Sequence, residues 1–416
     1  MTLNVQSALG LVVLILIAWL LGGARKKGAL KIIAVGVGLQ FVLALILLLI
    51  EPVRDALSLV TDAVEAMAAA TEAGTSIVFG YLAGGPAPFE VSNAGAMFVL
   101  AFRGLPLILL VSALSALLTY WRILPWIIQA ISRVLEKSFG IGGAVGLATA
   151  ANIFIGSVEA PLFVRPYLAR MTRSELFVLM VGGAATIAGT MFVIYATILG
   201  AAVSDAAGNL LVASVMSAPA AIMVGLLMMP ETETRTSGHV AVTSEASGAM
   251  DAIVQGTEQG IKIVLGVIAM LIVLVALVSL VNQILGLFPD VWGAPLSLQR
   301  LLGYVLAPLA WLLGIPWAEA ETAGQLLGTR VILTEFVAYL DLAALPTGTL
   351  TERSEIILTY AMCGFSSLAA LGIIIGGLSA MVPSRRAEIV ALAPRSILAG
   401  LIATSLTGCV VGVLIS

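Results

Sequence analysis

The chain has 416 residues, of which 60% are hydrophobic and only 10% are charged, and its formal net charge is -3. A soluble domain carries about 25% charged residues, so this chain cannot cover its surface with side chains that face water. The composition excludes a soluble protein, and the small net charge gives no indication of nucleic-acid binding. We interpret the chain as an all-α polytopic membrane protein, because each backbone N–H group in lipid needs a partner within its own segment.

The apolar segments predict about eight transmembrane helices together with two irregular regions. In chain order they are 7–23, 29–50, 94–120, 139–165, 174–200, 209–229, 252–284, 298–345, 354–380 and 394–415. Residues 53–72 place acidic residues among apolar ones at helical spacing, which predicts an amphipathic helix at the membrane interface. Residues 79–91 are rich in Gly and Pro and predict a loop, and the basic, aromatic stretch 121–137 is expected to run along a surface.

Charges beside the spans predict the orientation of the chain. Arg25, Lys26 and Lys27 follow the first apolar run instead of preceding it, which is not typical of a cleaved signal peptide. The positive-inside rule makes this cluster cytoplasmic and puts the N-terminus outside. Arg385 and Arg386 are a second cytoplasmic candidate, so the last span is expected to leave the C-terminus outside as well.

The two irregular regions resemble each other. Each has a Gly-containing apolar segment that ends in a glutamate, GSVE at 156–159 and GTRVILTE at 328–335. A polar turn follows, TRSEL at 172–176 and ERSEI at 352–356, and then a span interrupted by small residues, GGAATIAG at 182–189 and CGFSSLAA at 363–370. The common order of three features indicates an internal repeat.

Duplicated broken helices indicate the binding site of a secondary transporter. Irregular backbone at membrane depth is tolerated only where it is buried in protein or lines a wet cavity. We therefore expect Glu159 in a re-entrant hairpin that faces a cavity, with Glu335 as its counterpart in the second repeat. A glutamate inside the membrane costs roughly 2.5 kcal/mol or more and is usually functional, although helix packing or an interfacial position is the alternative for both residues.

Other polar residues are more ambiguous. Ser157, Thr186 and Ser367 could be site residues or ordinary contacts between membrane helices. For Arg103, Arg165 and Arg330 we expect snorkelling near a helix end rather than a site role. We expect His239, in the polar loop 230–250, to be solvated. The two cysteines, Cys363 and Cys409, lie in apolar runs, and two Cys with one His are too few for a disulfide framework or a metal site.

Several ordered stretches resemble the concentrative nucleoside transporter family. They are NIFIGSVEAPLFVRPYLARMTRSEL, GGAATIAG, GIPWAEAETAGQLLGTRVILTEFVAYL and AMCGFSSLAALGI, together with MDAIVQGTEQGIKIVLGVIAMLIVLVALVSLVN, which is similar to the family's long crossing helix. The similarity runs from about residue 95 to the end, after a three-helix start of the bacterial type. It implies a homotrimer in the bacterial inner membrane that imports nucleosides with a cation, usually Na⁺ and sometimes H⁺.

The resemblance also implies a division of the chain into a scaffold and a moving transport domain. Residues 1–138 would form N-terminal scaffold helices, and 139–205 the first repeat, with a hairpin and a broken helix. Residues 206–297 would return to the scaffold with the long crossing helix. Residues 298–380 would form the second repeat, and 381–416 the C-terminal helix. The two re-entrant hairpins are expected in an inverted repeat that moves like an elevator.

Site residues can be carried over from the family by motif. The resemblance assigns Glu159, with Gly156, Ser157 and Val158, to the base side of a nucleoside, and Glu335, with Thr334, to the ribose side. It places Phe365, Ser367 and Ala370 near the ribose motif. It implies a Na⁺ site made by the side chains of Asn152 and Thr186 and the carbonyls of Ile155 and Ile187, and no other cofactor.

The chain differs from the family at the positions that contact the substrate in the family. Ser157 and Val158 stand where the family has Gln and Thr or Ser, Ser367 and Ala370 replace its ribose-binding Asn and Ser, and Thr334 replaces a common Asn. A modified nucleoside or another small polar solute is therefore the alternative substrate, with H⁺ as the alternative coupling ion carried by one of the glutamates. A channel or a non-transporting protein is disfavoured, and the absence of a nucleophile–base pair, a metal cluster or a phosphate loop argues against an enzyme.

Overall fold

The computed structural model describes residues 2–24, 28–91, 97–157, 159–200, 202–236, 246–290 and 295–415. Within these ranges the chain is helical and no strand occurs. Seven helices of the described residues are long and apolar enough to cross a membrane, or eight if α13 (Leu298–Leu312) and α14 (Trp317–Ile332), which are bent by 118° relative to each other, form one span. The predicted all-helical membrane fold is confirmed in this part of the chain. The basic residues 25–27, His239 and Val158 lie outside the described ranges.

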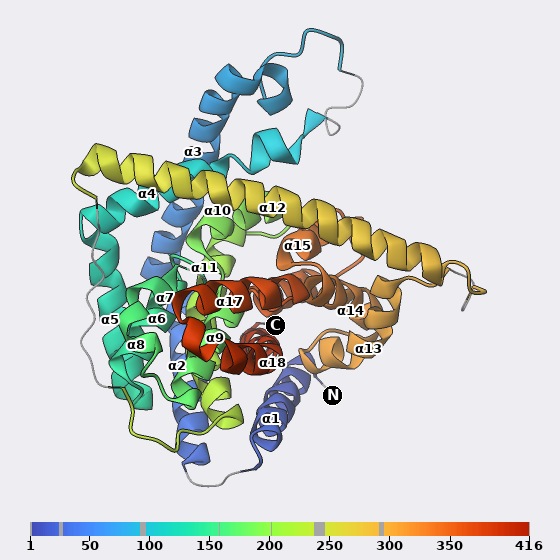
Figure 1. The fold of residues 1–416 in the computed structure, drawn as a ribbon. Coiled ribbons are helices and arrows are strands. Elements are labelled where there is room, and N and C mark those ends of the chain that lie inside the picture. The colour runs from blue at the N-terminus through green and yellow to red at the C-terminus, as the bar shows by residue number, and fades with distance from the viewer. Residues whose placement is uncertain are drawn as a thin grey trace.

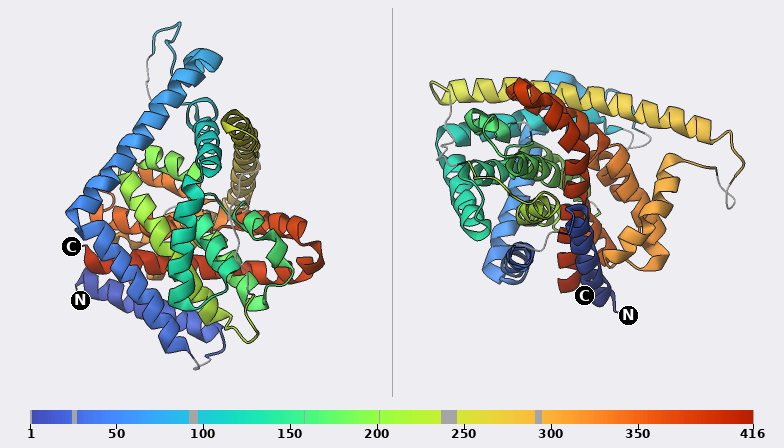
Figure 2. Two further views of the ribbon diagram at one scale, coloured as in Figure 1. Left: turned by 90° about the vertical axis from the view of Figure 1, so that its left-hand side faces the viewer. Right: turned by 60° about the horizontal axis from the view of Figure 1, so that its bottom comes forward.

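The N-terminal part contains α1 (Leu3–Leu21), α2 (Ala29–Leu49), α3 (Glu51–Phe79) and the short η1 (Gly80–Ala83). The amphipathic helix α3 is seven residues longer at its end than the predicted 53–72, and its C-terminal part projects beyond the helices on which the rest of it packs (Figure 1; Figure 2). The third apolar run begins with a π-helical turn, η3 (Leu100–Gly104), before α4 (Leu107–Tyr120). Arg103 in that turn forms an ion pair of 3.0 Å with Glu72 of α3.

Each irregular region forms a helical hairpin followed by a broken helix. Hairpin 1 comprises α6 (Gly143–Asn152), α7 (Ala160–Phe163) and α8 (Arg165–Leu168), and hairpin 2 comprises α14 (Trp317–Ile332) and α15 (Glu335–Ala343). The first broken helix is α9 (Arg173–Ala185) and α10 (Gly189–Leu199), with break 1 at 186–188. The second is α16 (Glu352–Met362) and α17 (Leu368–Met381), with break 2 at 363–367. The segment 174–200 is thus two half-helices.

The polar turns that first indicated the repeat are helix N-caps. The side chain of Thr172 accepts a hydrogen bond of 3.0 Å from the backbone N–H of Glu175, and the Glu175 carboxylate accepts one from the N–H of Thr172. In the second repeat the side chain of Thr351 accepts from the N–H of Ser354 at 3.4 Å. Such caps satisfy backbone donors that have no partner inside the helix. Both broken helices therefore start at a threonine for the same physical reason.

The repeated order includes one further helix at each end. Hairpin 1 follows α5 (Ile123–Phe139) and its broken helix leads to α11 (Ala206–Met228); hairpin 2 follows α13 (Leu298–Leu312) and its broken helix leads to α18 (Arg386–Leu414), after the short η4 (Pro383–Arg385). The packing has the same pattern in both repeats, since α9 and α16 each lie against both α11 and α18, and α11 lies against α18. This arrangement is expected of two related halves.

The long helix α12 (Ala249–Leu285) connects the halves and lies along one side of the molecule (Figure 1; Figure 2). It packs closely on α4 because two glycines leave room for the α4 backbone. A Cβ at Gly256 would lie 2.6 Å from the carbonyl oxygen of Ser112, and a Cβ at Gly260 would lie 3.1 Å from the Cα of Leu109. Small residues of this kind allow close helix crossings in membranes. Much of the remaining apolar surface of α12 is uncovered, and Ile272 is 65% exposed.

The two chain ends lie together in all views (Figure 1; Figure 2). Asn4 on α1 donates two hydrogen bonds of 2.9 Å, to the carbonyl oxygens of Val413 and Ile415. Arg353 on α16 donates to the carbonyls of Gly412 at 2.6 Å and of Ile415. These contacts join α1, α16 and the end of α18.

Candidate substrate and cation site

A cavity of about 340 Å³ lies where the two hairpins, the two breaks and α12 meet. This volume is within the range of small-molecule sites, about 300 to 1,000 Å³. Its polar lining comes from residues far apart in the sequence, while apolar residues of α12 close one side. The lining includes Gly156, Ser157, Glu159, Thr186, Ile187, Thr190, Tyr195, Ile263, Met270, Thr334, Glu335, Phe336 and Phe365. Glu159 and Glu335 therefore face one cavity, as expected from the repeat.

Backbone geometry in hairpin 1 places Glu159 at the cavity. Gly156 has a φ of 122°, a backbone conformation that residues other than Gly rarely adopt. A Cβ there would lie 2.6 Å from Oε2 of Glu159 and 3.0 Å from the Cβ of Ala188 in break 1. The other carboxylate oxygen of Glu159 accepts a hydrogen bond of 3.0 Å from Nε2 of Gln259 on α12. Hairpin 1 is thus tied to the long helix through a glutamate of the cavity.

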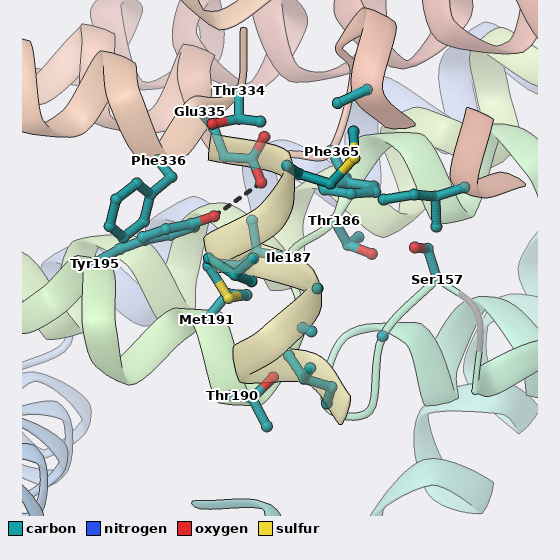
Figure 3. Close-up of a pocket in the computed structure, with 18 of the residues that line it drawn as sticks. Ser157, Thr186, Ile187, Thr190, Met191, Tyr195, Thr334, Glu335, Phe336 and Phe365 are labelled. Carbon is teal, nitrogen blue, oxygen red and sulfur yellow. Dashed lines mark hydrogen bonds between the residues drawn. The ribbon is translucent and has the colours of Figure 1, made fainter. Parts of the chain in front are cut away.

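Glu335 is the first residue of α15 and its side chain is 2% exposed. Thr334 caps this helix by accepting from the N–H of Val337 at 3.4 Å. Oε1 of Glu335 accepts a hydrogen bond of 2.8 Å from the hydroxyl of Tyr195 on α10, as Figure 3 shows. Among the described residues, Oε2 of Glu335 is buried and has no hydrogen-bond partner. A free acceptor of this kind can receive a polar hydrogen from a ligand.

The residues expected to hold a cation also meet. Nδ2 of Asn152, the last residue of α6, donates to the carbonyl of Gly182 at 2.9 Å and to the hydroxyl of Thr186 in break 1. In the described part of the chain the Oδ1 of Asn152 is buried without a partner. The Oδ1 of Asn152 and the hydroxyl oxygen of Thr186 are hard oxygen atoms of the kind that bind Na⁺. The buried Oδ1, which has no hydrogen-bond partner, fits a cation ligand.

One backbone contact holds hairpin 1 against the start of α10. The N–H of Gly189 donates to the carbonyl of Phe154 at 3.0 Å, and a Cβ at Gly189 would lie 2.4 Å from that oxygen. Ile155 directly follows Phe154, and Ile187 lies two positions before Gly189. Both residues are therefore close in sequence to this hydrogen bond. Their predicted role as carbonyl ligands is compatible with this position and stays a prediction.

The predicted ribose motif is only partly at the cavity. Phe365 lines it, as do Ser157 and Thr334 (Figure 3). The side chain of Ser367 is fully buried and caps α17 by accepting from the N–H of Ala370 at 3.2 Å. Neither residue is among those that line the cavity. Val158, the remaining predicted contact, lies outside the described residues.

Arg330 is fully buried, and the expectation of snorkelling is wrong for this residue. Its guanidinium donates to the carbonyl of Ala361 at 2.7 Å and to that of Gly364 at 3.2 Å, at the end of α16 and in break 2. Its charge attracts Glu335. By contrast, Arg165 is exposed, and Arg103 is partly exposed beside Glu72.

Three important residues were not identified from the sequence. They are Tyr195, Gln259 and Ser366. Ser366 in break 2 donates a hydrogen bond of 2.6 Å to the carbonyl of Ala184, so break 2 contacts the end of α9. Tyr195 carried a usable signal, since a phenol buried in an apolar run usually has a hydrogen-bond partner.

The cavity combines charged and polar groups with apolar walls. Two carboxylates, a phenol and the hydroxyl groups of Ser157, Thr186, Thr190 and Thr334 share it with apolar side chains. Broken helices around such a cavity, within a chain of apolar spans, define a membrane transporter.

Comparison with known proteins agrees with this class. The chain matches the Na⁺ dependent nucleoside transporter N-terminus at residues 9–82, the nucleoside recognition Gate domain at 101–202 and the Na⁺ dependent nucleoside transporter C-terminus at 209–412. It is 36% identical to an uncharacterized transporter of Haemophilus influenzae over 99% of this chain and 97% of that protein. It is 35% identical to sodium/nucleoside cotransporter 1 of Rattus norvegicus, covering 95% of this chain and 62% of that longer protein.

Solved structures show the same fold. A structure of CNTnw in an inward-facing, substrate-bound state superposes with a TM-score of 0.90 and 34% identity, over 99% of this chain and 98% of that one. A variant of CNTnw in an outward-facing state also gives a TM-score of 0.90. The chain belongs to the concentrative nucleoside transporter family. It is a multi-pass membrane transporter and not an enzyme.

Proposed function

We propose that the protein imports nucleosides by symport with Na⁺. The observation that carries this proposal is the meeting of Glu159, Glu335 and the breaks of both broken helices at one cavity, beside the orphaned Oδ1 of Asn152. Nucleoside substrates and Na⁺ coupling are named for the mammalian relatives. The residues present fit both ligands.

Glu335 binds the sugar. Its Oε2 is a buried acceptor without a partner, and a vicinal diol has two hydroxyl groups that can donate to one carboxylate. Hydrogen bonds to a charged acceptor are the strong ones. Tyr195 holds Oε1 and so fixes the rotamer of the carboxylate. Phe365 and Thr334 border the same region, while Ser367 and Ala370 act through the start of α17 instead of through direct contact.

Glu159 and Ser157 face the base. The serine reaches less far than the family's glutamine, so the base edge is read by few groups. Oε1 of Glu159 is held by Gln259, which leaves Oε2 for the ligand. We infer weak discrimination between purine and pyrimidine bases.

Asn152 and Thr186 hold the coupling ion, with the carbonyls of Ile155 and Ile187 as further ligands. Bound Na⁺ would supply positive charge at the carbonyl end of α9 and so favour docking of hairpin 1. The Asn152 amide already joins α6 to Gly182 and Thr186, so its side chain links the hairpin to break 1. Ion binding and cavity formation are thereby coupled through the same residues.

Transport follows from movement of the hairpins and broken helices relative to the scaffold. The proposed divisions are 1–138, 206–297 and 381–416 for the scaffold and 139–205 and 298–380 for the moving part, which acts as an elevator. The proposed assembly is a homotrimer in the lipid bilayer of the bacterial inner membrane, with both termini outside. The uncovered apolar surface of α12 supports contact with lipid or with a neighbouring copy.

The direct test is uptake of radiolabelled nucleosides into proteoliposomes. We expect uptake of ribonucleosides under an inward Na⁺ gradient and little uptake when choline replaces Na⁺. Glu335→Gln in the same vesicles provides the inactive control. Full uptake driven by a proton gradient without any effect of Na⁺ would overturn the ion assignment, and lack of uptake of every nucleoside would overturn the substrate class.

A further inference from the structure

The internal repeat allows the two breaks to be compared position by position. Hairpin 1 ends its first helix at Asn152 beside break 1, and hairpin 2 brings Arg330, in the last turn of its first helix, beside break 2. Each side chain donates a hydrogen bond to a carbonyl oxygen in the last turn of the half-helix that leads into the break of its own repeat, and Arg330 donates a second one to a carbonyl inside break 2. These carbonyls belong to Gly182 in the first repeat and to Ala361 and Gly364 in the second.

The difference between the two positions is charge. Asn152 is neutral, and its Oδ1 is buried without a partner among the described residues. The first position therefore has an oxygen atom available to bind a cation. Arg330 is a cation that is fully buried. It uses two nitrogen atoms on carbonyls, which is the role that a bound metal cation plays toward carbonyl ligands.

Electrostatics explains why positive charge is favourable at both positions. The C-terminal end of a helix carries about half a negative charge, and α9 and α16 both end inside the protein. Break 2, which directly follows α16, contacts the end of α9, since Ser366 donates to the carbonyl of Ala184 and a Cβ at Gly364 would lie 2.8 Å from the carbonyl oxygen of Ala185. The buried carboxylate of Glu335 adds further negative charge near Arg330.

We propose that Arg330 is a fixed cation that occupies, in the second repeat, the position where the first repeat takes up its mobile Na⁺. This inference rests on the proposed function. Arg330 is a positioning residue: its guanidinium holds the end of α16 and break 2 without reaching the cavity lining. A transport cycle then needs one mobile cation at the breaks, because the second position is permanently filled.

The test uses purified full-length protein with Arg330→Ala, Arg330→Met and Arg330→Lys, and guanidinium chloride at millimolar concentrations as the probe. The first readout is the melting temperature without nucleoside, which does not depend on the proposed substrate. We expect guanidinium to raise the melting temperature of Arg330→Ala and to leave the wild type and Asn152→Ala unchanged. Urea at the same concentrations is the matched neutral control.

The second readout is the affinity for uridine at saturating Na⁺. Loss of a buried donor that leaves two carbonyl oxygens without a partner predicts a decrease of about 30-fold or more in Arg330→Met, with Arg330→Lys close to the wild type and Arg330→Ala partly restored by guanidinium. Equal affinities for Arg330→Met and Arg330→Lys, or no effect of guanidinium on Arg330→Ala, would overturn the proposal. If Arg330→Ala does not fold, the comparison of Met with Lys decides. Failure of the wild type to bind any nucleoside would instead overturn the proposed function, while the melting experiment would still test Arg330.

Discussion

Tyr195 and Glu335 lie 140 positions apart in the chain and share a buried hydrogen bond of 2.8 Å. The bond joins the first broken helix to the tip of hairpin 2. Tyr195 also packs against Tyr339 of α15, with ring centroids 5.0 Å apart. The two repeats therefore meet at the carboxylate to which we assign the sugar.

Tyr195→Phe should weaken nucleoside binding by about tenfold or more, because a hydrogen bond to a charged group contributes about 1.5 to 3 kcal/mol. The ring and its packing are retained, so the folded state should persist. Equilibrium binding measured at saturating Na⁺ checks this. Tyr304→Phe makes the same change on α13, away from the cavity lining, and should leave the affinity unchanged; equal losses in both variants would contradict the assignment.

Glu335→Gln should damage uptake far more than Ser367→Ala. Removing the charge from a buried polar contact costs about 2 to 5 kcal/mol of binding. Ser367 caps α17, so its replacement should lower the free energy of unfolding by about 0.5 to 2 kcal/mol and affect uptake less. Initial uptake rates and melting temperatures of both variants separate the two effects. A Ser367→Ala variant that lost nucleoside affinity as severely would place Ser367 in direct contact with substrate.

Asn152→Ala should shift the Na⁺ concentration needed for half-maximal uptake to higher values. At saturating Na⁺ the affinity for nucleoside should change less, because Asn152 does not line the cavity. Na⁺ titrations at several nucleoside concentrations provide the measurement. An unchanged Na⁺ requirement would show that the cation binds elsewhere.

A ribonucleoside should compete for uptake much better than its 2′,3′-dideoxy analogue, while purine and pyrimidine ribonucleosides should compete similarly. The first expectation follows from the free oxygen of Glu335 and the second from Ser157. Equal competition by the dideoxy analogue would mean that no diol is recognised, and another small polar solute would replace the nucleoside as substrate.

Gly189→Ala should destabilise the protein by about 1 to 3 kcal/mol, as overpacking does. The added methyl group would lie 2.4 Å from the carbonyl oxygen of Phe154 and would separate hairpin 1 from α10. Gly376→Ala is the matched control, since a Cβ there meets no atom within 4 Å. Thermal unfolding in detergent should show a clear loss for Gly189→Ala alone.

The sequence predicted the broken helices well, because Gly, Ser and Thr interrupt apolar runs only where backbone is protected from lipid. The same signal indicated Glu159 and Glu335, which line one cavity. These predictions rested on local composition and on order along the chain, both of which a repeat preserves.

Long-range pairing was not predictable in the same way. Arg330 looked like a residue near a helix end, and only the fold places the end of α16 around its guanidinium. Ser367 matched a substrate motif, but helix capping uses its hydroxyl instead. Gln259 contacts Glu159 across 100 positions, a pairing that no spacing rule indicates.

The hydrogen bonds from Asn4 and Arg353 to carbonyl oxygens near the end of α18 hold the two ends of the chain close together. A short linker could join the ends, and new ends could be opened in the connection between α11 and α12. The permuted chain would present the second repeat before the first while keeping every helix contact. The natural and the permuted chain would then have the same fold but would translate and insert the two repeats in opposite order. Comparing them would show whether insertion depends on which repeat is made first.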